Sequence, residues 1–241
     1  MPTPSYRTTC TQNRKLCHDV FEIKLRMPEG QRFTFKAGQF VLFDVPLVSK
    51  PDDIQPRAYS IASPPSEAHE FTFILRYKPG GRASCWVDQT LREGATVRIQ
   101  GPLGAFMLDL NTAKEYVLVG TGAGVAPFRS HLKWALEEKG DKRPMYLFFG
   151  VRHEEDLFWV EELRNLEASF PNLKVMVSVS QPQGSWTGLT GRVTDVMPNV
   201  LRDFSRISAY VCGNTDMVKS VKEWFLGKGA PKADVHQEGY V

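Results

Sequence analysis

Cysteine is scarce in this chain, and the cysteines present are not clustered. The four of them form no C-x-x-C pair; they are Cys10, Cys17, Cys85 and Cys212. Zinc and iron–sulfur sites are normally built from thiolates at short spacing. We therefore predict no metal centre and no built-in iron–sulfur cluster. We expect free thiols, because disulfides are rare in the cytoplasm, where we place this protein.

Long apolar runs and a strong excess of charge are also missing. No stretch approaches the ~18 apolar residues of a membrane-spanning helix, and no basic segment followed by an apolar one marks a signal peptide at the start. The net charge is only +3, whereas nucleic-acid-binding domains usually carry a basic stripe. The sequence thus predicts a cytoplasmic protein with no membrane span and no nucleic-acid partner.

The first half of the chain consists of short β-like runs separated by turn residues such as Pro-Glu-Gly, Pro-Asp-Asp and Pro-Gly-Gly. One helix-like segment, residues 82–91, interrupts them. Short strands at fairly even spacing indicate an antiparallel barrel or sandwich. The predicted strands are residues 19–26, 39–45, 57–61, 70–77 and 96–100.

The second half changes to nearly continuous apolar runs separated by amphipathic stretches. Runs of this kind are typical of strands buried on both faces of a parallel sheet, and their alternation with helices predicts a doubly wound α/β domain. The predicted strands are residues 115–120, 145–151, 173–179 and 208–212, and the predicted helices 127–139, 156–169 and 216–226. Because the rhythm changes near residues 109–114, we predict domains at 1–112 and 113–241.

A glycine-rich turn follows the first apolar run. Residues 120–127 read Gly-Thr-Gly-Ala-Gly-Val-Ala-Pro and open a predicted helix. In this context glycines let the backbone approach a pyrophosphate, and the free amides at the helix start attract its charge. Pro127 stands where the common dinucleotide turn has a glycine. The residues alone therefore leave open a phosphate-binding turn or a plain glycine-rich connection.

Six segments in this order resemble the ferredoxin–NADP reductase superfamily, which includes flavodoxin, free-flavin and oxygenase reductases. They are FKAGQF (35–40), RAYS (57–60), GRAS (81–84), GPLG (101–104), GTGAGVAP (120–127) and CGN (212–214). The resemblance implies an N-terminal, Greek-key-like antiparallel β-barrel that binds FAD. It also implies a C-terminal doubly wound parallel sheet that binds NADH or NADPH.

The segment 57–60 resembles the flavin motif of the superfamily. Arg57 offers a forked guanidinium to the FAD pyrophosphate. Tyr59, two residues on and so on the same strand face, offers its ring to the isoalloxazine. By the resemblance, Ser60 hydrogen-bonds near flavin N5 and is a catalytic candidate. Taken one at a time, these three residues would be interpreted as a surface arginine, a core tyrosine and a turn serine. Because they occur together within the matching segments, we favour the flavin site.

Three further segments are expected near FAD. The start of the helix after residue 80 would cradle a phosphate, although an ordinary helix cap by its serine is a competing interpretation. Relatives often cover the flavin with an aromatic residue from the C-terminus, a role that Tyr240 would take. The residues of the helix start and of the strand before it are Gly81, Arg82, Ala83 and Ser84, and Leu75, Arg76 and Tyr77.

By the same resemblance, the nicotinamide cofactor lies at the ends of buried strands. Cys212 and Gly213 would face the nicotinamide ring, with the Cys212 thiol as a small, catalytic neighbour of the hydride path. Glu238 would relay a proton. The residues expected to bind the rest of the dinucleotide on and near the glycine-rich turn are Thr121, Gly122, Gly124, Pro127 and Met217.

The choice between NADH and NADPH depends on residues near the adenosine 2′-phosphate. Arg152 and Arg192 are candidates for an anion, although Arg152 in an ordinary surface salt bridge is an alternative. NADPH-specific relatives usually carry Ser-Arg after the next strand, whereas this chain has Ser180-Gln181. Glu154 and Glu155, near Arg152, would repel a phosphate or accept a hydrogen bond from a ribose hydroxyl. The balance favours NADH, with use of both cofactors plausible.

The resemblance implies a monomeric NAD(P)H-dependent flavoprotein reductase that passes electrons singly to a separate acceptor. We expect ferredoxin, flavodoxin or an oxygenase component, because the chain has no cysteine cluster of its own. A free-flavin or ferric reductase and an electron-transfer subunit of a larger redox complex are the alternatives. A non-redox binding module is disfavoured, because Arg57, Tyr59 and Ser60 are all intact.

Overall fold

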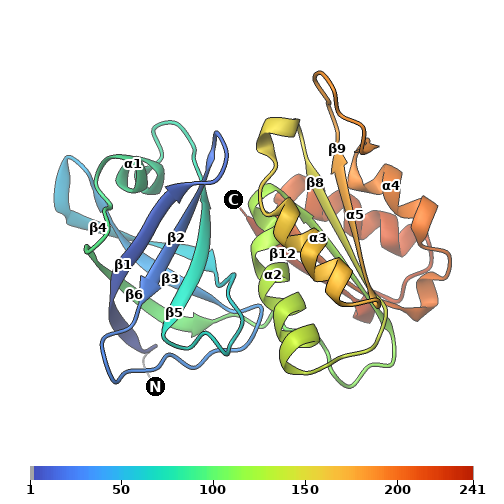
Figure 1. The fold of residues 1–241 in the computed structure, drawn as a ribbon, viewed down its shortest axis with the longest axis horizontal. Coiled ribbons are helices and arrows are strands. Elements are labelled where there is room, and N and C mark those ends of the chain that lie inside the picture. The colour runs from blue at the N-terminus through green and yellow to red at the C-terminus, as the bar shows by residue number, and fades with distance from the viewer. Residues whose placement is uncertain (1–2, 241) are drawn as a thin grey trace. The chain divides into compact units, whose positions relative to one another are not determined.

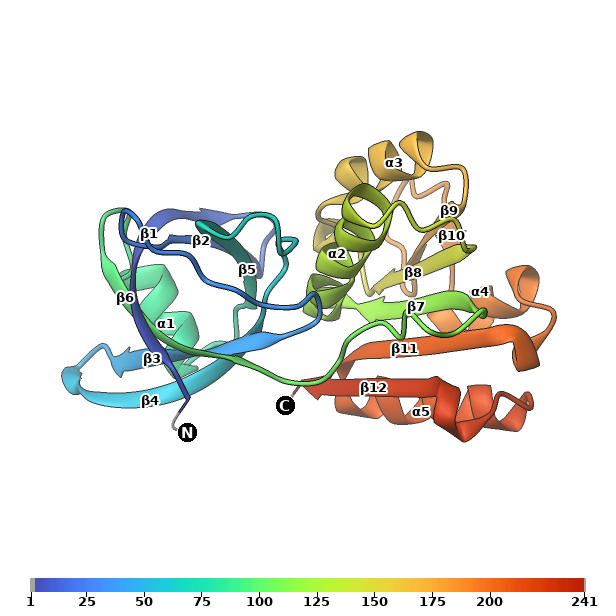
Figure 2. The same ribbon diagram turned by 90° about the horizontal axis from the view of Figure 1, so that it is seen from below.

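The computed structural model describes residues 3–240, which form two compact units (Figures 1 and 2). Unit 1 runs to Leu108 and also includes Arg129–Glu138, whereas unit 2 consists of Asp109–Phe128 and the residues from Lys139 on. None of the helices in residues 3–240 is long and apolar enough to cross a membrane.

Unit 1 is an antiparallel six-stranded sheet that curls around a core of aromatic side chains. In hydrogen-bonded order the strands run β4-β3-β6-β1-β2-β5, so β4 and β5 are the two unpaired edges. Phe33, Phe43, Phe71 and Phe73 are almost fully buried, and Trp86 from the helix α1 joins the same cluster. The elements are β1 (Ser5–Lys15), β2 (Val20–Arg26), β3 (Phe40–Leu47), β4 (Lys50–Ser60), β5 (Glu70–Arg76), α1 (Arg82–Gln89) and β6 (Thr96–Leu103).

Unit 2 is a parallel six-stranded sheet in the order β10-β9-β8-β7-β11-β12. The chain starts in the middle at β7, adds three strands on one side, and then returns to add β11 and β12 on the other. The helices α4 and α5 share one hydrophobic core on one face of this sheet, and α3 covers the other face (Figure 2). The elements are β7 (Glu115–Thr121), β8 (Met145–Val151), α3 (Val160–Ser169), β9 (Leu173–Val179), β10 (Leu189–Thr190), α4 (Val193–Val200), β11 (Ile207–Asn214), α5 (Thr215–Gly227) and β12 (Val235–Tyr240).

The predicted fold class is confirmed, but several elements lack a clear signal in the sequence. β1 was not predicted because it reads SYRTTCTQNRK, with only Thr8 and Cys10 fully buried. β12 is a polar edge strand, and α4 contains Pro198. The helix predicted at 156–169 begins later, at Val160, because the preceding residue Trp159 has a left-handed φ of 55°.

A buried histidine fixes the turn that leads into β3. Helix α2 (Ala126–Lys133) is followed by a π turn, Trp134–Glu138, and carries His131, which is 0% exposed. The imidazole meets the backbone of Ala37 and Phe106, and burial lowers its pKa to about 4. Gly38 has a φ of +92°, and a β-carbon there would lie 2.2 Å from the His131 Nε2 atom. Gly38 is therefore required both by its conformation and by the histidine against it.

Two residues beside His131 hold the chain that follows β4. The Arg129 guanidinium donates to the Ala62 carbonyl at 2.9 Å, and the Ser130 hydroxyl donates to the Ser63 carbonyl at 2.7 Å. Ser130 is fully buried, so the carbonyl that it contacts is satisfied away from water. Three successive side chains of α2 thus fix the backbone on both sides of the β3–β4 pair.

We expect His131 to make the protein acid-sensitive. Its pKa falls from an ordinary 6.5 to about 4 on folding, so the unfolded chain binds more protons between these values. The stabilisation is complete above pH 6.5 and is lost as the pH falls toward 4, by about 3 kcal/mol of unfolding free energy. His131→Leu should flatten this part of the pH profile in urea titrations, whereas His69→Gln, at an exposed position, should leave it unchanged. Equal slopes in all three proteins would refute the assignment.

Candidate functional site

The predicted flavin motif lies on the open edge of the barrel. Arg57 and Tyr59 on β4 stand opposite Phe43 and Val41 on β3, whose side chains are fully buried. They therefore share the inward face of the sheet, on a strand that has no hydrogen-bonded strand on its far side within residues 3–240. Tyr59 is half-buried, and its ring meets Phe43 edge-on with centroids 4.9 Å apart. Burial raises the pKa of Tyr59, which keeps the phenol neutral.

Within the described part of the chain, the hydrogen-bond partners of Arg57 lie on its own strand. Its guanidinium donates to the Pro56 carbonyl and to the Gln55 side-chain oxygen, each at 2.8 Å. Neither partner is charged, so an anion would compete successfully for the same donors. Ser60, at the end of β4, is 5% exposed and pairs with Phe40 of β3.

The start of α1 is a tight turn tied together by Ser84. The Ser84 hydroxyl accepts from the Lys78 amide at 2.8 Å, and a β-carbon on Gly81 would lie 3.0 Å from the Lys78 carbonyl. Ser84 does not cap the helix, because the N-cap position is Gly81 without a side-chain cap and the Ser84 hydroxyl binds an amide that precedes the helix. The Arg82 side chain is also committed, since it donates to the Asp53 carboxylate at 3.0 Å. What the helix start can offer an anion is the backbone amides of its first turn.

The three residues expected at the end of β5 and directly after it have different surroundings. The Leu75 side chain is 2% exposed and packs in the barrel core, so a contact of this residue with FAD would be made by its backbone. Arg76 forms an ion pair with Asp19 at 2.7 Å, and Tyr77 packs against the core with its ring 6.3 Å from that of Phe21.

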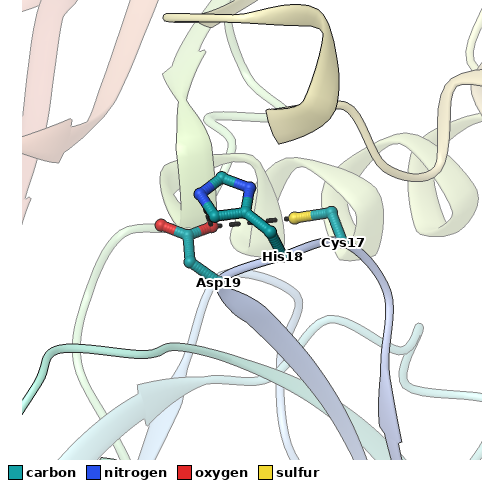
Figure 3. A group of neighbouring side chains, drawn as sticks. All are labelled: Cys17, His18 and Asp19. Atoms are coloured by element: carbon teal, nitrogen blue, oxygen red, sulfur yellow. Dashed lines mark hydrogen bonds and ion pairs between the residues drawn. The ribbon is translucent and has the colours of Figure 1, made fainter.

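The hairpin between β1 and β2 brings a thiol, an imidazole and a carboxylate together, in Cys17, His18 and Asp19 (Figure 3). Their potential ligand atoms lie within 4.8 Å of one another. Two features oppose a bound cation. The Asp19 carboxylate already faces Arg76, and burial raises the pKa of the Cys17 thiol, which disfavours the thiolate that a metal binds. The cluster therefore gives no support to a metal centre.

In unit 2 the predicted cofactor residues meet where the strand order reverses, between β7 and β11. The turn after β7 begins with a 3₁₀ turn, Gly122–Val125, before α2. A β-carbon on Gly124 would lie 2.2 Å from the Cys212 carbonyl oxygen. On Gly213, whose φ is +144°, it would lie 2.6 Å from the Thr121 hydroxyl and 2.8 Å from the Met217 methyl group. Open α/β sheets bind their ligands at such a reversal, outside the carboxyl ends of the strands.

Cys212 is the buried end of this arrangement. Its side chain is 0% exposed, and burial raises the pKa of the thiol, so it is a neutral SH group. Tyr240 hydrogen-bonds with the Cys212 sulfur, and Glu238 lies close enough to act on the thiol electrostatically. The parallel pairing of β11 with β12 explains this, because it sets Cys212 beside Glu238. The C-terminal residues singled out in the sequence therefore gather around Cys212.

The residues expected near the adenosine lie on two neighbouring loops, after β8 and β9. The Arg152 guanidinium donates to the Gln181 side-chain oxygen at 2.9 Å, and the Ser180 amide donates to the Val151 carbonyl. The Glu154 carboxylate accepts from the Gln183 amide. Arg192 is exposed at the start of α4.

Sequence reasoning missed two features, His131 and Trp186. The histidine gave no signal, because an amphipathic helix does not show which backbone its residues meet. Trp186 did give one, as a lone aromatic in the polar stretch QPQGSWTG. Its indole lies against Gly188 and donates to the Leu189 carbonyl at 3.0 Å.

Comparison with known proteins agrees with this division of the chain. Residues 7–108 match the family model of the oxidoreductase FAD-binding domain, and residues 118–223 match that of the oxidoreductase NAD-binding domain. The FAD-binding model thus matches the barrel, and the NAD-binding model matches the parallel sheet.

Two curated relatives align over nearly the whole chain. A ferredoxin–NAD(P)(+) reductase component of naphthalene 1,2-dioxygenase/salicylate 5-hydroxylase systems from Ralstonia is 33% identical over 239 residues, 99% of this chain and 70% of that protein. Ferredoxin–NADP reductase B of Sorangium cellulosum is 33% identical over 234 residues, 94% of each chain.

Among solved structures, a cytochrome P450 reductase from Amycolatopsis superposes with a TM-score of 0.88 at 25% identity, covering 99% of this chain and 71% of that one. With both family models matched and a third of the residues shared with full-length relatives, the chain belongs to the ferredoxin–NADP reductase superfamily, as an FAD-binding, NAD(P)H-dependent oxidoreductase.

Proposed function

We propose that this protein oxidises NADH at the β7–β11 reversal and delivers the electrons, through FAD held at the β4 edge, to a separate one-electron acceptor. The observation that carries the proposal is the close approach of Gly124 to Cys212 and Gly213. It builds a nucleotide turn directly beside the buried thiol. FAD, when bound, supplies the chemistry, because it accepts a hydride and gives electrons up singly.

The residues at the β4 edge fit a flavin. Arg57 and Tyr59 are on the same face of an unpaired strand, the guanidinium has only neutral partners, and the ring is held by Phe43. We propose that Arg57 holds the pyrophosphate, that Tyr59 packs on the ring system, and that the first amides of α1 add donors. Ser60, whose burial excludes water, would hydrogen-bond the reacting edge.

The residues at the strand reversal fit a dinucleotide. Gly124 leaves no room for a side chain, and the amides of the following turn are available to a pyrophosphate. Cys212 offers a neutral, dry contact for the nicotinamide. We propose that Tyr240 and Glu238 control access and proton supply there, and that the functional domains are 1–112 and 113–241.

The acceptor is proposed from the relatives. The Ralstonia and Sorangium proteins are by name ferredoxin reductases, and the Amycolatopsis structure is a cytochrome P450 reductase. We propose a ferredoxin or an oxygenase component as the partner, a monomeric state, and a cytoplasmic location, where its four free cysteines would remain reduced. Release of reduced flavin as the product is the rival activity.

Reduction by NADH tests the proposal directly. The FAD-loaded protein should lose its visible flavin absorbance when NADH is added without oxygen, and should then reduce a [2Fe–2S] ferredoxin in catalytic amounts. Stopped-flow absorbance and a cytochrome c-coupled assay measure the two steps. A bleached protein that turns over only with added free flavin would favour the flavin-reductase alternative. A protein that NADH does not bleach at all would end the proposal.

Arg57 should hold FAD through charge. Arg57→Ala removes charge-assisted hydrogen bonds worth about 1.5–3 kcal/mol, so the dissociation constant for FAD should rise roughly 10- to 100-fold. Equilibrium dialysis with flavin fluorescence measures it. The matched control is Arg98→Ala on β6, an arginine paired with Asp44, which should retain wild-type affinity. Similar affinities in the two variants would remove Arg57 from the site.

Cofactor preference should depend on Arg152 and Gln181. The wild type should have a higher kcat/KM with NADH than with NADPH, because a neutral amide stands where a second cation would meet the 2′-phosphate. Gln181→Arg should raise kcat/KM for NADPH roughly 10-fold, about 1.4 kcal/mol, and Arg152→Ala should lower it selectively. Comparable wild-type rates with both cofactors would refute the NADH preference, and an unselective Arg152→Ala would refute the role of that arginine.

A further inference from the structure

The Gly38 turn, residues 36–39, is closed by one of its own side chains. The Gln39 amide donates to the Lys36 carbonyl at 3.1 Å, and the Gln39 side-chain oxygen accepts from the Lys36 amide at 2.8 Å. The side-chain amide of Gln39 also donates to the Gly104 carbonyl at 3.4 Å. Hydrogen bonds within the turn and to the segment after β6 therefore give the turn a defined shape.

The end of β4 is attached to this turn. β3 begins at Phe40, directly after the turn, and Phe40 pairs with Ser60. The next amide, that of Ile61, donates to the Gln39 carbonyl at 3.0 Å. Ser60 is 5% exposed, so water has little access to replace these contacts. A shift of the Gly38 turn would therefore move Ser60.

His131 fixes the Gly38 turn from a distant part of the chain. The imidazole interacts with the backbone of Ala37, inside the turn, and with the backbone of Phe106. A β-carbon on Gly38 would lie 2.2 Å from the His131 Nε2 atom and 2.0 Å from the Phe106 carbonyl oxygen. Because these contacts are polar as well as close, they restrict both the position and the orientation of the turn. An apolar side chain of similar size would fill the space without directing the backbone.

We propose that His131, acting through the Gly38 turn, is a positioning residue that sets the Ser60 hydroxyl for the reduction of FAD. The inference rests on the proposed function and adds a residue outside the proposed cofactor contacts. In that step NADH gives a hydride to the flavin, so NADH is oxidised to NAD⁺ and FAD takes up both electrons. A hydrogen-bond donor lowers the barrier only where its geometry matches the reacting atom, and a misplacement of about 1 Å can cost up to ~10²-fold in rate.

A double-mutant cycle on the FAD-loaded protein tests this link. His131→Leu should slow flavin reduction at saturating NADH about 10-fold, the effect of one lost hydrogen bond, with KM for NADH unchanged. Ser60→Ala should slow it by a similar factor. The double variant should be no slower than Ser60→Ala, because His131 acts through that hydroxyl. His131→Gln, which keeps an N–H donor, should retain most of the wild-type rate.

Two further measurements on the FAD-loaded protein need no NADH. The midpoint potential of FAD in His131→Leu should shift in the same direction as in Ser60→Ala, with no further shift in the double variant. Hydrogen exchange of the Ile61 amide should be faster in His131→Leu, because the Gln39 carbonyl that accepts from it is less well fixed. Gln39→Met removes the side-chain hydrogen bonds of the turn at a half-buried position, where folding should survive, and should reproduce these changes.

The matched control is Thr8→Val, which removes another buried hydrogen bond of unit 1, from the Thr8 hydroxyl to the Val97 carbonyl at 2.8 Å. It should lower stability and leave the reduction rate and the potential unchanged. Additive losses in the double variant, equal rates in His131→Leu and His131→Gln, or a wild-type rate in Gln39→Met would each overturn the proposal. Absence of reduction by NADH would refute the proposed function, whereas the potential and the amide exchange would still decide the role of His131.

Discussion

The turn after β7 lies so close to the end of β11 that no side chain fits between them. A β-carbon on Gly124 would lie 2.2 Å from the Cys212 carbonyl oxygen, and one on Gly213 would lie 2.6 Å from the Thr121 hydroxyl. In the usual dinucleotide turn a third glycine gives this closeness to helix and strand. Here Gly124 gives a comparable closeness, but to the different strand β11. The arrangement of residues at the β7–β11 reversal depends on this one approach.

In unit 1 the governing constraint is the unpaired edge of β4. An exposed edge strand invites pairing with other chains, and this one is protected by Pro51 and Pro56, which donate no hydrogen bond, and by the acidic Asp52 and Asp53. Those devices lie before Arg57, so the last residues of the strand remain regular and paired with β3. The prolines and acidic residues thus oppose strand addition along the first part of β4, whereas the last part, with Arg57 and Tyr59, stays regular.

The sequence predicted most accurately the strands that are buried on both faces. The runs at β7, β8, β9 and β11 are apolar because both sheet faces are covered, and their limits agree with the structure to within about a residue or two. β1 and β12 were not predicted from the sequence, because edge or half-exposed strands need few apolar residues. Three contacts were not predicted for another reason. They are the inward direction of the Leu75 side chain, the hydrogen bond between Ser84 and Lys78, and the packing of Trp186 on Gly188. Each depends on which segments tertiary packing brings together, which no local pattern encodes.

In helix α2, three successive polar side chains satisfy buried backbone groups of unit 1. Arg129, Ser130 and His131 are successive, and each meets a backbone group: the Ala62 carbonyl, the Ser63 carbonyl, and the backbone of Ala37 and Phe106. A buried carbonyl left without a donor costs about 1–3 kcal/mol, so these contacts specify where residues 61–63 run. Since Ser60 immediately precedes them and the Ile61 amide donates to the Gln39 carbonyl, the end of β4 is fixed from both strands. Apolar packing alone would fix the position of Ser60 less closely, because apolar contacts depend little on small rotations and shifts of the backbone, whereas hydrogen bonds depend strongly on them.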